Sequence, residues 1–162
     1  MKYHPLTDKI KKLLTQNKYW FETFEHEPVR TSEKAAKIRT GYTINQGAKA
    51  LILRIKKSKK EKYFVMLVFP AHLKFNSNKV RKLLEAKDMR FGTKEEVSQI
   101  TDGVQFGAIP PFGNLFDLKV IVDPKLFENE KIVFNAGDRK LSIGMKSEDY
   151  KNLVSPKISS IT

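Results

Sequence analysis

The chain contains no cysteine and only three histidines, His4, His26 and His72, among its 162 residues. The lack of cysteine excludes disulfides, zinc–thiolate sites and a cysteine nucleophile. The three histidines do not have the spacing of metal ligands, so we expect no metal site. The chain also lacks GxxxxGK, GxGxxG and the serine-hydrolase motif GxSxG, and we expect no cofactor.

Long apolar runs are missing too. No segment approaches the roughly 20 apolar residues of a membrane-spanning helix. Residues 1–5 are not followed by the apolar stretch of a signal peptide. We therefore expect a cytoplasmic protein with no membrane partner.

Positive charge is abundant. Lys and Arg number 31 against 18 Asp and Glu, which gives a formal net charge of +13. Such a surplus predicts an anionic partner, first nucleic acid and second an anionic membrane surface. A solvated lysine-rich surface without a partner is the plain alternative.

Apolar periodicity predicts one domain over residues 1–162, of α+β (mixed α/β) class, since helices and strands interleave without regular alternation. The strand 63–69 is apolar on both faces, so we expect it to lie centrally and to form a hairpin with 48–55. Helices are predicted over 6–19, after Thr31 or Ser32, around 78–84, after Thr93 and from Ser147, and strands over 21–25, 48–55, 63–69, 115–122, 132–135 and 141–145.

Lys49 lies near the start of the strand 48–55. Period-two alternation places it on the same face as Leu51, Leu53 and Ile55. Burial of an ammonium group on an apolar face is costly without an anion, which points to a ligand phosphate or carboxylate. A lysine at a strand end that extends to water fits the pattern equally well.

Residues 102–113 form a turn-rich segment with three glycines and two adjacent prolines. Glycines allow close backbone approach and prolines stiffen a loop, so its N–H groups could bind an anion or a developing oxyanion. Composition alone favours a purely structural connection.

These features together resemble the YbaK/prolyl-tRNA-editing family, in order, from about residue 20 to 154. The stretch 46–53 is similar to the G-A-K-A-L strand of that family, with Lys49 at its signature lysine. The stretch 107–113 is similar to the G-x-x-P-P-x-G loop. Weaker similarities cover 25–31, 32–36, 91–97 and 134–137.

The resemblance implies a curved mixed β-sheet flanked by helices and a free-standing aminoacyl-tRNA deacylase. Its substrates would be mischarged tRNAs of the tRNA(Pro) type, such as Ala-tRNA(Pro) or Cys-tRNA(Pro), with a synthetase as a further partner. Some branches carry a histidine within the stretch 135–142. This chain has none there, which argues against a mechanism based on that histidine.

We expect Lys49 to orient the ester and the loop amides to stabilise the oxyanion. Phe112 lines the amino-acid pocket or belongs to the core. The expected catalytic positions are Lys49, Gly107, Ala108, Ile109, Pro110 and Pro111; the expected substrate-binding positions are Phe112, Gly113, Asn135, Gly137 and Ser142; and the expected tRNA-binding positions are Lys56, Lys57, Lys59 and Lys60.

Two other function classes remain open. A non-catalytic module that binds tRNA or a synthetase would use the same basic surface. A membrane-surface protein would use the helix within residues 5–20, although its apolar stripe is ordinary for a helix that packs on a core.

Overall fold

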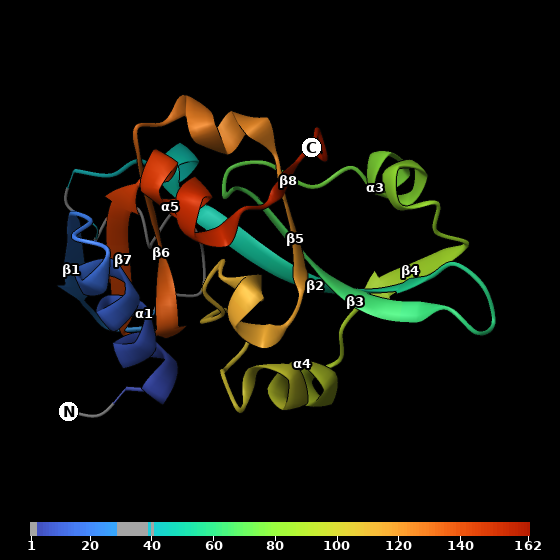
Figure 1. Cartoon of the computed structure of the whole chain (residues 1–162), viewed down its shortest axis with the longest axis horizontal. Coiled ribbons are helices and arrows are strands. Elements are labelled where there is room, and N and C mark those ends of the chain that lie inside the picture. The colour runs from blue at the N-terminus through green and yellow to red at the C-terminus, as the bar shows by residue number, and fades with distance from the viewer. Residues whose placement is uncertain (1–2, 29–38, 40) are drawn as a thin grey trace.

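The structure is a computed structural model that describes residues 3–28, 39 and 41–162. The helix predicted after Thr31 or Ser32 lies outside the described residues, apart from Arg39. The described helices are α1 (Pro5–Gln16), α3 (Ser77–Leu84), α4 (Lys94–Thr101) and α5 (Ser147–Val154), and the strands are β1 (Phe21–Glu25), β2 (Ala48–Lys56), β3 (Lys62–Pro70), β4 (Asp88–Phe91), β5 (Lys119–Val122), β6 (Lys131–Asp138), β7 (Leu141–Lys146) and β8 (Lys157–Ile158) (Figure 1).

The strands form two hydrogen-bonded sheets. The five-stranded sheet has the order β4-β2-β3-β5-β8 and is mixed, whereas the three-stranded sheet has the order β1-β7-β6 and is antiparallel. A bridge between Gly47 and Val133 links them. The predicted α+β class is confirmed, but two joined sheets replace the single curved sheet that we expected.

The predicted hairpin is confirmed. β2 and β3 pair over their whole length, from Ala48 opposite Pro70 to Lys56 opposite Lys62, and β3 lies in the middle of its sheet. Figure 1 shows this hairpin extending away from the three-stranded sheet, with β4 and α3 beside it. Lys49 is paired with Phe69.

Three local predictions differ from the structure. β4 was not predicted, because it has only four residues, two of them exposed and two half-buried, which is too short a stretch for alternation to stand out. The strand predicted over 115–122 is reduced to β5, because a 3-10 turn, Gly113–Phe116, occupies its first part. β6 does not end before Gly137 but continues to Asp138 through a register shift.

Side chains on the two faces of the hairpin belong to two separate core clusters. One contains Ala48, Ile52 and Met66 together with the buried residues of α1, β6 and β7. The other contains Leu53, Ile55 and Val65 together with residues of α3. This division is what period-two alternation predicts for a sheet covered on both faces. Among the described helices, none is long and apolar enough to cross a membrane.

Candidate active site

The site is organised by a bulge in β6. Asn135 of β6 is paired with Ser142 of β7, and the register shifts between Asn135 and Asp138. Gly137 lies within the shift with φ +95°, a left-handed conformation that glycine adopts without strain. A Cβ at Gly137 would also lie 3.3 Å from Thr7 Oγ1 of α1. The bulge thus exposes one edge of β6 to the segment 105–113.

Hydrogen bonds from the bulge hold the carbonyl groups of this segment. Asn135 Nδ2 donates to the Gly107 carbonyl oxygen, and the Gly137 N–H donates to the Ala108 carbonyl oxygen at 2.9 Å. Farther along, the buried Tyr150 hydroxyl donates to the Pro111 carbonyl oxygen at 2.6 Å. The carbonyl oxygens of Gly107, Ala108 and Pro111 are therefore each held by a hydrogen bond from another element of the protein.

Four amide groups of the loop have no described acceptor, those of Gly107, Ile109, Phe112 and Gly113, and the last two lie in the core. The Ala108 N–H donates to the Gln105 carbonyl at 3.0 Å, and Pro110 and Pro111 have no N–H. The N–H groups of Gly107 and Ile109 have no acceptor among the residues that the structure describes. Gly107 is exposed and has φ +83°. These two groups are therefore the donors that an incoming oxyanion could use.

A polar cluster lies on the other side of Asn135. His26, which directly follows β1, places Nε2 at 2.8 Å from Ser142 Oγ and Nδ1 at 2.9 Å from the Glu27 carbonyl oxygen. A carbonyl oxygen only accepts, so in the neutral ring Nδ1 carries the proton and Nε2 accepts from the Ser142 hydroxyl. Ser142 is completely buried, which makes it a positioning group rather than a nucleophile.

Arg39 completes the cluster. Its Nε donates to Ser142 Oγ and its Nη2 donates to Asn135 Oδ1, both at 3.0 Å. The side chain is 7% exposed. Burial lowers the pKa of Arg39 to about 10, so the guanidinium remains charged at neutral pH. His26 and Arg39 were not predicted as site residues, because each reaches the cluster through a contact that spans about a hundred residues of sequence.

Lys49 is exposed, and within the described part of the chain it makes no hydrogen bond or ion pair. β4 pairs with β2 only from Leu53 to Lys56, so the edge of β2 over residues 48–51 has no described partner strand on that side. The Gly92 N–H donates to the Ile52 carbonyl on this side of β2. Backbone N–H and C=O groups point to alternate sides along a strand, so those of Ala50 also point to this side. Backbone N–H and C=O groups without a described partner strand therefore lie beside Lys49.

Two of the predicted substrate-binding positions are core residues. Phe112 is completely buried, and its ring makes edge contacts with Phe134 and Tyr150 at centroid distances of 5.3 and 5.4 Å. Of its two interpretations, the structure favours the core. Gly113 is buried against Val120, where a Cβ would lie 2.7 Å from Cγ2. Both residues hold the loop rather than line an open pocket.

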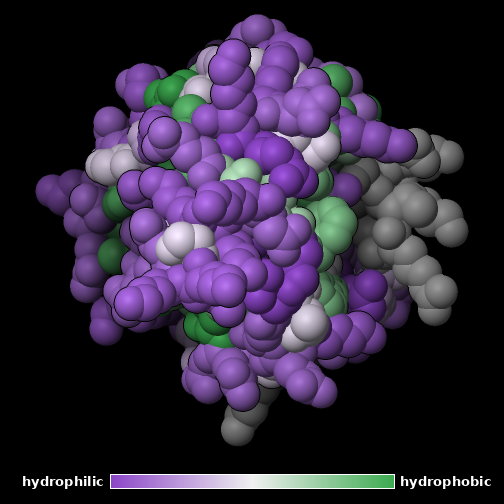
Figure 2. All heavy atoms as spheres, turned by 90° about the vertical axis from the view of Figure 1, so that its right-hand side faces the viewer, coloured by the Kyte–Doolittle hydropathy of each residue, from purple (hydrophilic) through white to green (hydrophobic). Residues whose placement is uncertain are grey.

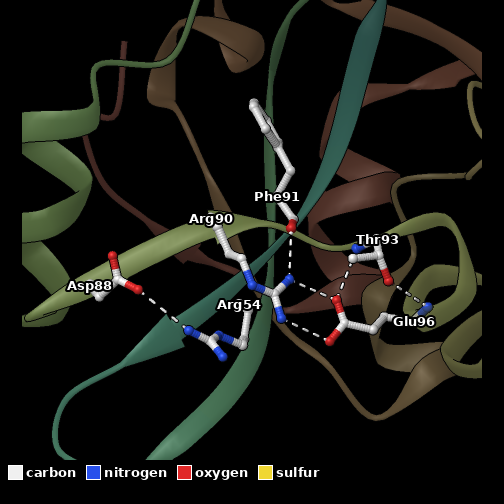
Figure 3. Close-up of polar contacts among 6 residues, drawn as sticks. All are labelled: Arg54, Asp88, Arg90, Phe91, Thr93 and Glu96. Atoms are coloured by element: carbon white, nitrogen blue, oxygen red, sulfur yellow. Dashed lines mark hydrogen bonds and ion pairs between the residues drawn. The ribbon is translucent and has the colours of Figure 1, made fainter.

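The helix before the loop is fixed by a carboxylate with two functions. Glu96 of α4 accepts hydrogen bonds from Arg90 Nη1 and Nη2, at 2.7 and 3.0 Å, and from the Thr93 N–H at 2.9 Å. The Thr93 hydroxyl accepts from the Glu96 N–H at 3.1 Å, which completes a capping box at the start of the helix predicted after Thr93. Figure 3 shows this network beside a second pair, Arg54 and Asp88. The network ties β4 to the start of α4.

The predicted tRNA-binding lysines lie where the sequence placed them, at the tip of the β2–β3 hairpin. Residues 54–90 contain 12 Lys or Arg but only three Asp or Glu, so most of the net charge of +13 comes from this segment. Figure 2 shows the side of the molecule formed by the hairpin, α3 and β4, and its surface is predominantly hydrophilic. A polyanion would meet positive charge on this side.

Comparison with known proteins identifies the family. The family model described as aminoacyl-tRNA editing domain matches residues 26–153. The Escherichia coli K12 protein named multifunctional Ser/Thr-tRNA deacylase ProXp-y is 33% identical over 147 residues, which cover 90% of this chain and 86% of that protein. The same protein from E. coli O157:H7 matches to the same extent.

Two solved structures share the fold. A crystal structure described as a candidate trans-editing enzyme for prolyl-tRNA synthetase superposes with a TM-score of 0.82, with 18% identity and 99% of each chain covered. A structure from work on epitope grafting onto scaffold proteins has a TM-score of 0.79 and 18% identity, and covers 98% of this chain and 97% of that one. At such identity the likeness shows the fold alone. By the family match and the 33% identical relative, this chain belongs to the aminoacyl-tRNA editing domains, a family of deacylases that act on mischarged tRNA.

Proposed function

We propose that the protein is a trans-acting deacylase that hydrolyses the ester between a wrong amino acid and the terminal ribose of a tRNA. One observation carries this proposal beyond family membership. The loop carbonyl groups of Gly107 and Ala108 are bound to β6, whereas the N–H groups of Gly107 and Ile109 are left without a described acceptor. Fixed donors that need no reorganisation suit a carbonyl oxygen that becomes negatively charged.

In the proposed reaction, water adds to the ester carbonyl carbon and the carbonyl oxygen becomes an oxyanion near the N–H groups of Gly107 and Ile109. Collapse of this intermediate breaks the bond to the ribose oxygen, which leaves with a proton as a hydroxyl group. The products are the free amino acid and the uncharged tRNA. The neighbouring ribose hydroxyl would assist the attacking water, so no protein base is required.

Lys49 would bind the terminal phosphate or a ribose oxygen and orient the ester. Its exposed ammonium group and the open edge of β2 beside it support this role. A lysine acts as a compact point charge toward a phosphate. The step that it supplies is positioning, which can account for a large part of the rate of such a reaction.

Ser-tRNA and Thr-tRNA are the first substrates to test, because the 33% identical relative is named for them. The polar side chains of Asn135 and His26, which are only partly buried, also suit an amino acid with a hydroxyl group. Ala-tRNA(Pro) and Cys-tRNA(Pro), the substrates that the sequence resemblance implies, belong in the same panel.

The test is release of labelled amino acid from this panel by the wild type and by Lys49→Ala. We expect the wild type to deacylate at least one substrate and Lys49→Ala to be at least a hundredfold slower, with an unchanged melting temperature. Lys119→Ala, which changes an exposed lysine of β5 outside the basic hairpin, is the matched control. Full activity of Lys49→Ala would remove Lys49 from the mechanism. Salt-sensitive tRNA binding without any release would favour the non-catalytic binding module.

A further inference from the structure

A row of aromatic rings crosses the sheet face on which Lys49 lies. Phe69 is paired directly with Lys49, and the ring of Phe75 lies 6.3 Å from that of Phe69. The ring of Phe91 continues the row at 5.9 Å from Phe75, in an edge-on arrangement. Directly paired residues of antiparallel strands project to the same face, so Phe91, paired with Leu53, lies on the face of Leu51 and Lys49.

Exposure increases along this row. Phe69 is 1% exposed, Phe75 is half-buried and Phe91 is 58% exposed. Phe91 is more exposed than the three other large apolar residues that stand out at the described surface, Trp20, Phe106 and Ile158. It lies on the edge strand β4, where no further described strand covers it.

The backbone of Phe91 is held from the other face of its strand. Arg90 Nη1 donates to the Phe91 carbonyl oxygen at 3.0 Å while its guanidinium is paired with Glu96. Figure 3 shows the Phe91 ring on the opposite side of the β4 ribbon from this network. A phenyl ring has only two side-chain torsions, so with its backbone held and Phe75 beside it, Phe91 has little conformational freedom to lose when a flat partner stacks on it.

The surroundings of the row are basic. Residues 54–90, which include the hairpin tip, α3 and most of β4, carry 12 Lys or Arg against three Asp or Glu. An apolar protein partner would not require this surplus, and an anionic membrane offers phosphates but no flat bases, whereas a nucleic-acid strand presents both unstacked bases and phosphates. Aromatic rings beside positive charge are the usual means by which proteins bind single-stranded nucleic acid.

We infer that Phe91, backed by Phe75, stacks on an unpaired base of the tRNA 3′ end and guides the strand toward Lys49. This inference rests on the proposed deacylase function. Leu53, opposite Phe91, is four residues from Lys49 along β2, which corresponds to about 13 Å of strand. The last unpaired nucleotides would therefore follow the aromatic row, with the ester at its Lys49 end and the duplex against the basic hairpin.

The experiment compares Phe91→Ala, Phe91→Leu and Phe91→Trp with the wild type. The probe is a tRNA acceptor-stem minihelix with 2-aminopurine in its unpaired 3′ segment. We expect Phe91→Ala and Phe91→Leu to bind about five- to a hundredfold more weakly and to lose the fluorescence quenching that stacking causes, while Phe91→Trp retains both. Phe91→Leu keeps an apolar group at this position, so a general folding role would leave it close to the wild type.

Two controls isolate the stacking contribution. Trp20→Ala removes an exposed aromatic ring that lies under Lys131 Nζ outside this face, and it should leave binding unchanged. The slope of log K against log salt should be the same for Phe91→Ala and the wild type, because stacking releases no counterions, and it should decrease for Lys59→Ala.

The outcomes separate this inference from the proposed function. If the wild type releases an amino acid and Phe91→Leu matches it in affinity and quenching, the stacking role is refuted and the deacylase function stands. If the wild type releases no amino acid from any substrate but quenches the probe through Phe91, the ring binds nucleic acid in a protein that is not a deacylase. Equal binding of a minihelix without its unpaired 3′ segment would also refute the role of Phe91.

Discussion

Asn135 donates a hydrogen bond from its side-chain amide to the carbonyl oxygen of Gly107, 28 residues earlier in the chain. The same side chain accepts from Arg39 Nη2 through its Oδ1 atom. Asn135 therefore links a buried cation to the backbone of the loop whose N–H groups are the proposed oxyanion donors. The 107–108 peptide is held at both ends, by Asn135 at the Gly107 carbonyl and by the Gln105 carbonyl at the Ala108 N–H.

Replacement of Asn135 tests the first of these two contacts. Asn135→Ala leaves the Gly107 carbonyl without its donor, so the loop amides should lose part of their fixed orientation. Direct loss of an oxyanion donor lowers kcat about a hundred- to a thousandfold, and loss of its support should lower kcat about tenfold or more while KM changes little. Steady-state kinetics with the substrate identified in the panel measure this. Asn17→Ala, which removes a side-chain bond at the end of α1, is the control, and equal kcat for both variants would contradict the role of Asn135.

Gly113→Ala should destabilise the fold because the added methyl group clashes with core side chains, not because of backbone strain. A Cβ at Gly113 would lie 2.7 Å from Val120 Cγ2 and 3.3 Å from Met66 Cβ, both within the core. Overpacking of this kind costs about 1–3 kcal/mol of unfolding free energy. Urea unfolding measures the change.

Gly103→Ala is the matched variant for that experiment. Gly103 has φ +88° and open space where a Cβ would be, so its substitution tests the left-handed backbone conformation alone. We expect about 1–2 kcal/mol for Gly103→Ala, because an L side chain is disfavoured by this amount in the left-handed conformation. A Gly113→Ala variant as stable as the wild type would show that Val120 moves freely.

Glu96 should contribute a pH-dependent part of the stability. The hydrogen bond from Arg90, followed by that from the Thr93 backbone, lowers the pKa of Glu96 to about 2 from its ordinary value of 4.5. A carboxylate whose pKa is lowered by folding stabilises the protein above its unfolded pKa. That stabilisation is lost as the pH falls from about 4.5 toward 2.

The measurement is the urea midpoint of the wild type and of Glu96→Gln between pH 2 and pH 6. We expect the urea midpoint of Glu96→Gln to lie below that of the wild type at pH 6, and this gap to shrink as the pH falls toward 2. Glu95→Gln removes a charge from the same helical turn and serves as the control, because Glu95 has no described ion pair. A constant difference between Glu96→Gln and the wild type across this range would contradict the assignment.

Much of the fold could be predicted from local pattern. Alternation along 48–55 and 63–69 identified the hairpin, its basic tip and the face of Lys49, because each of these depends on residues close in sequence. β4 could not be predicted in the same way. It has only four residues, two exposed and two half-buried, and it exists as a strand because β2 offers it a partner.

The candidate site was predictable only in part. The loop 107–113, Asn135 and Ser142 were found through the family resemblance, and the structure brings Gly107, Asn135 and Ser142 together. His26 and Arg39 were missed. His26 reaches Ser142 because β1 pairs with β7, and that long-range pairing leaves no local signal in the sequence.

The two functions of Glu96 have an evolutionary consequence. Its carboxylate caps α4 through Thr93 whether or not Arg90 is present, but Arg90 has no other carboxylate partner among the described residues. Lineages should therefore be able to exchange Arg90 while they keep Glu96, whereas loss of Glu96 would leave Arg90 with its bond to the Phe91 carbonyl and no ion pair. Among relatives the two positions should covary in one direction, with the glutamate the older member of the pair.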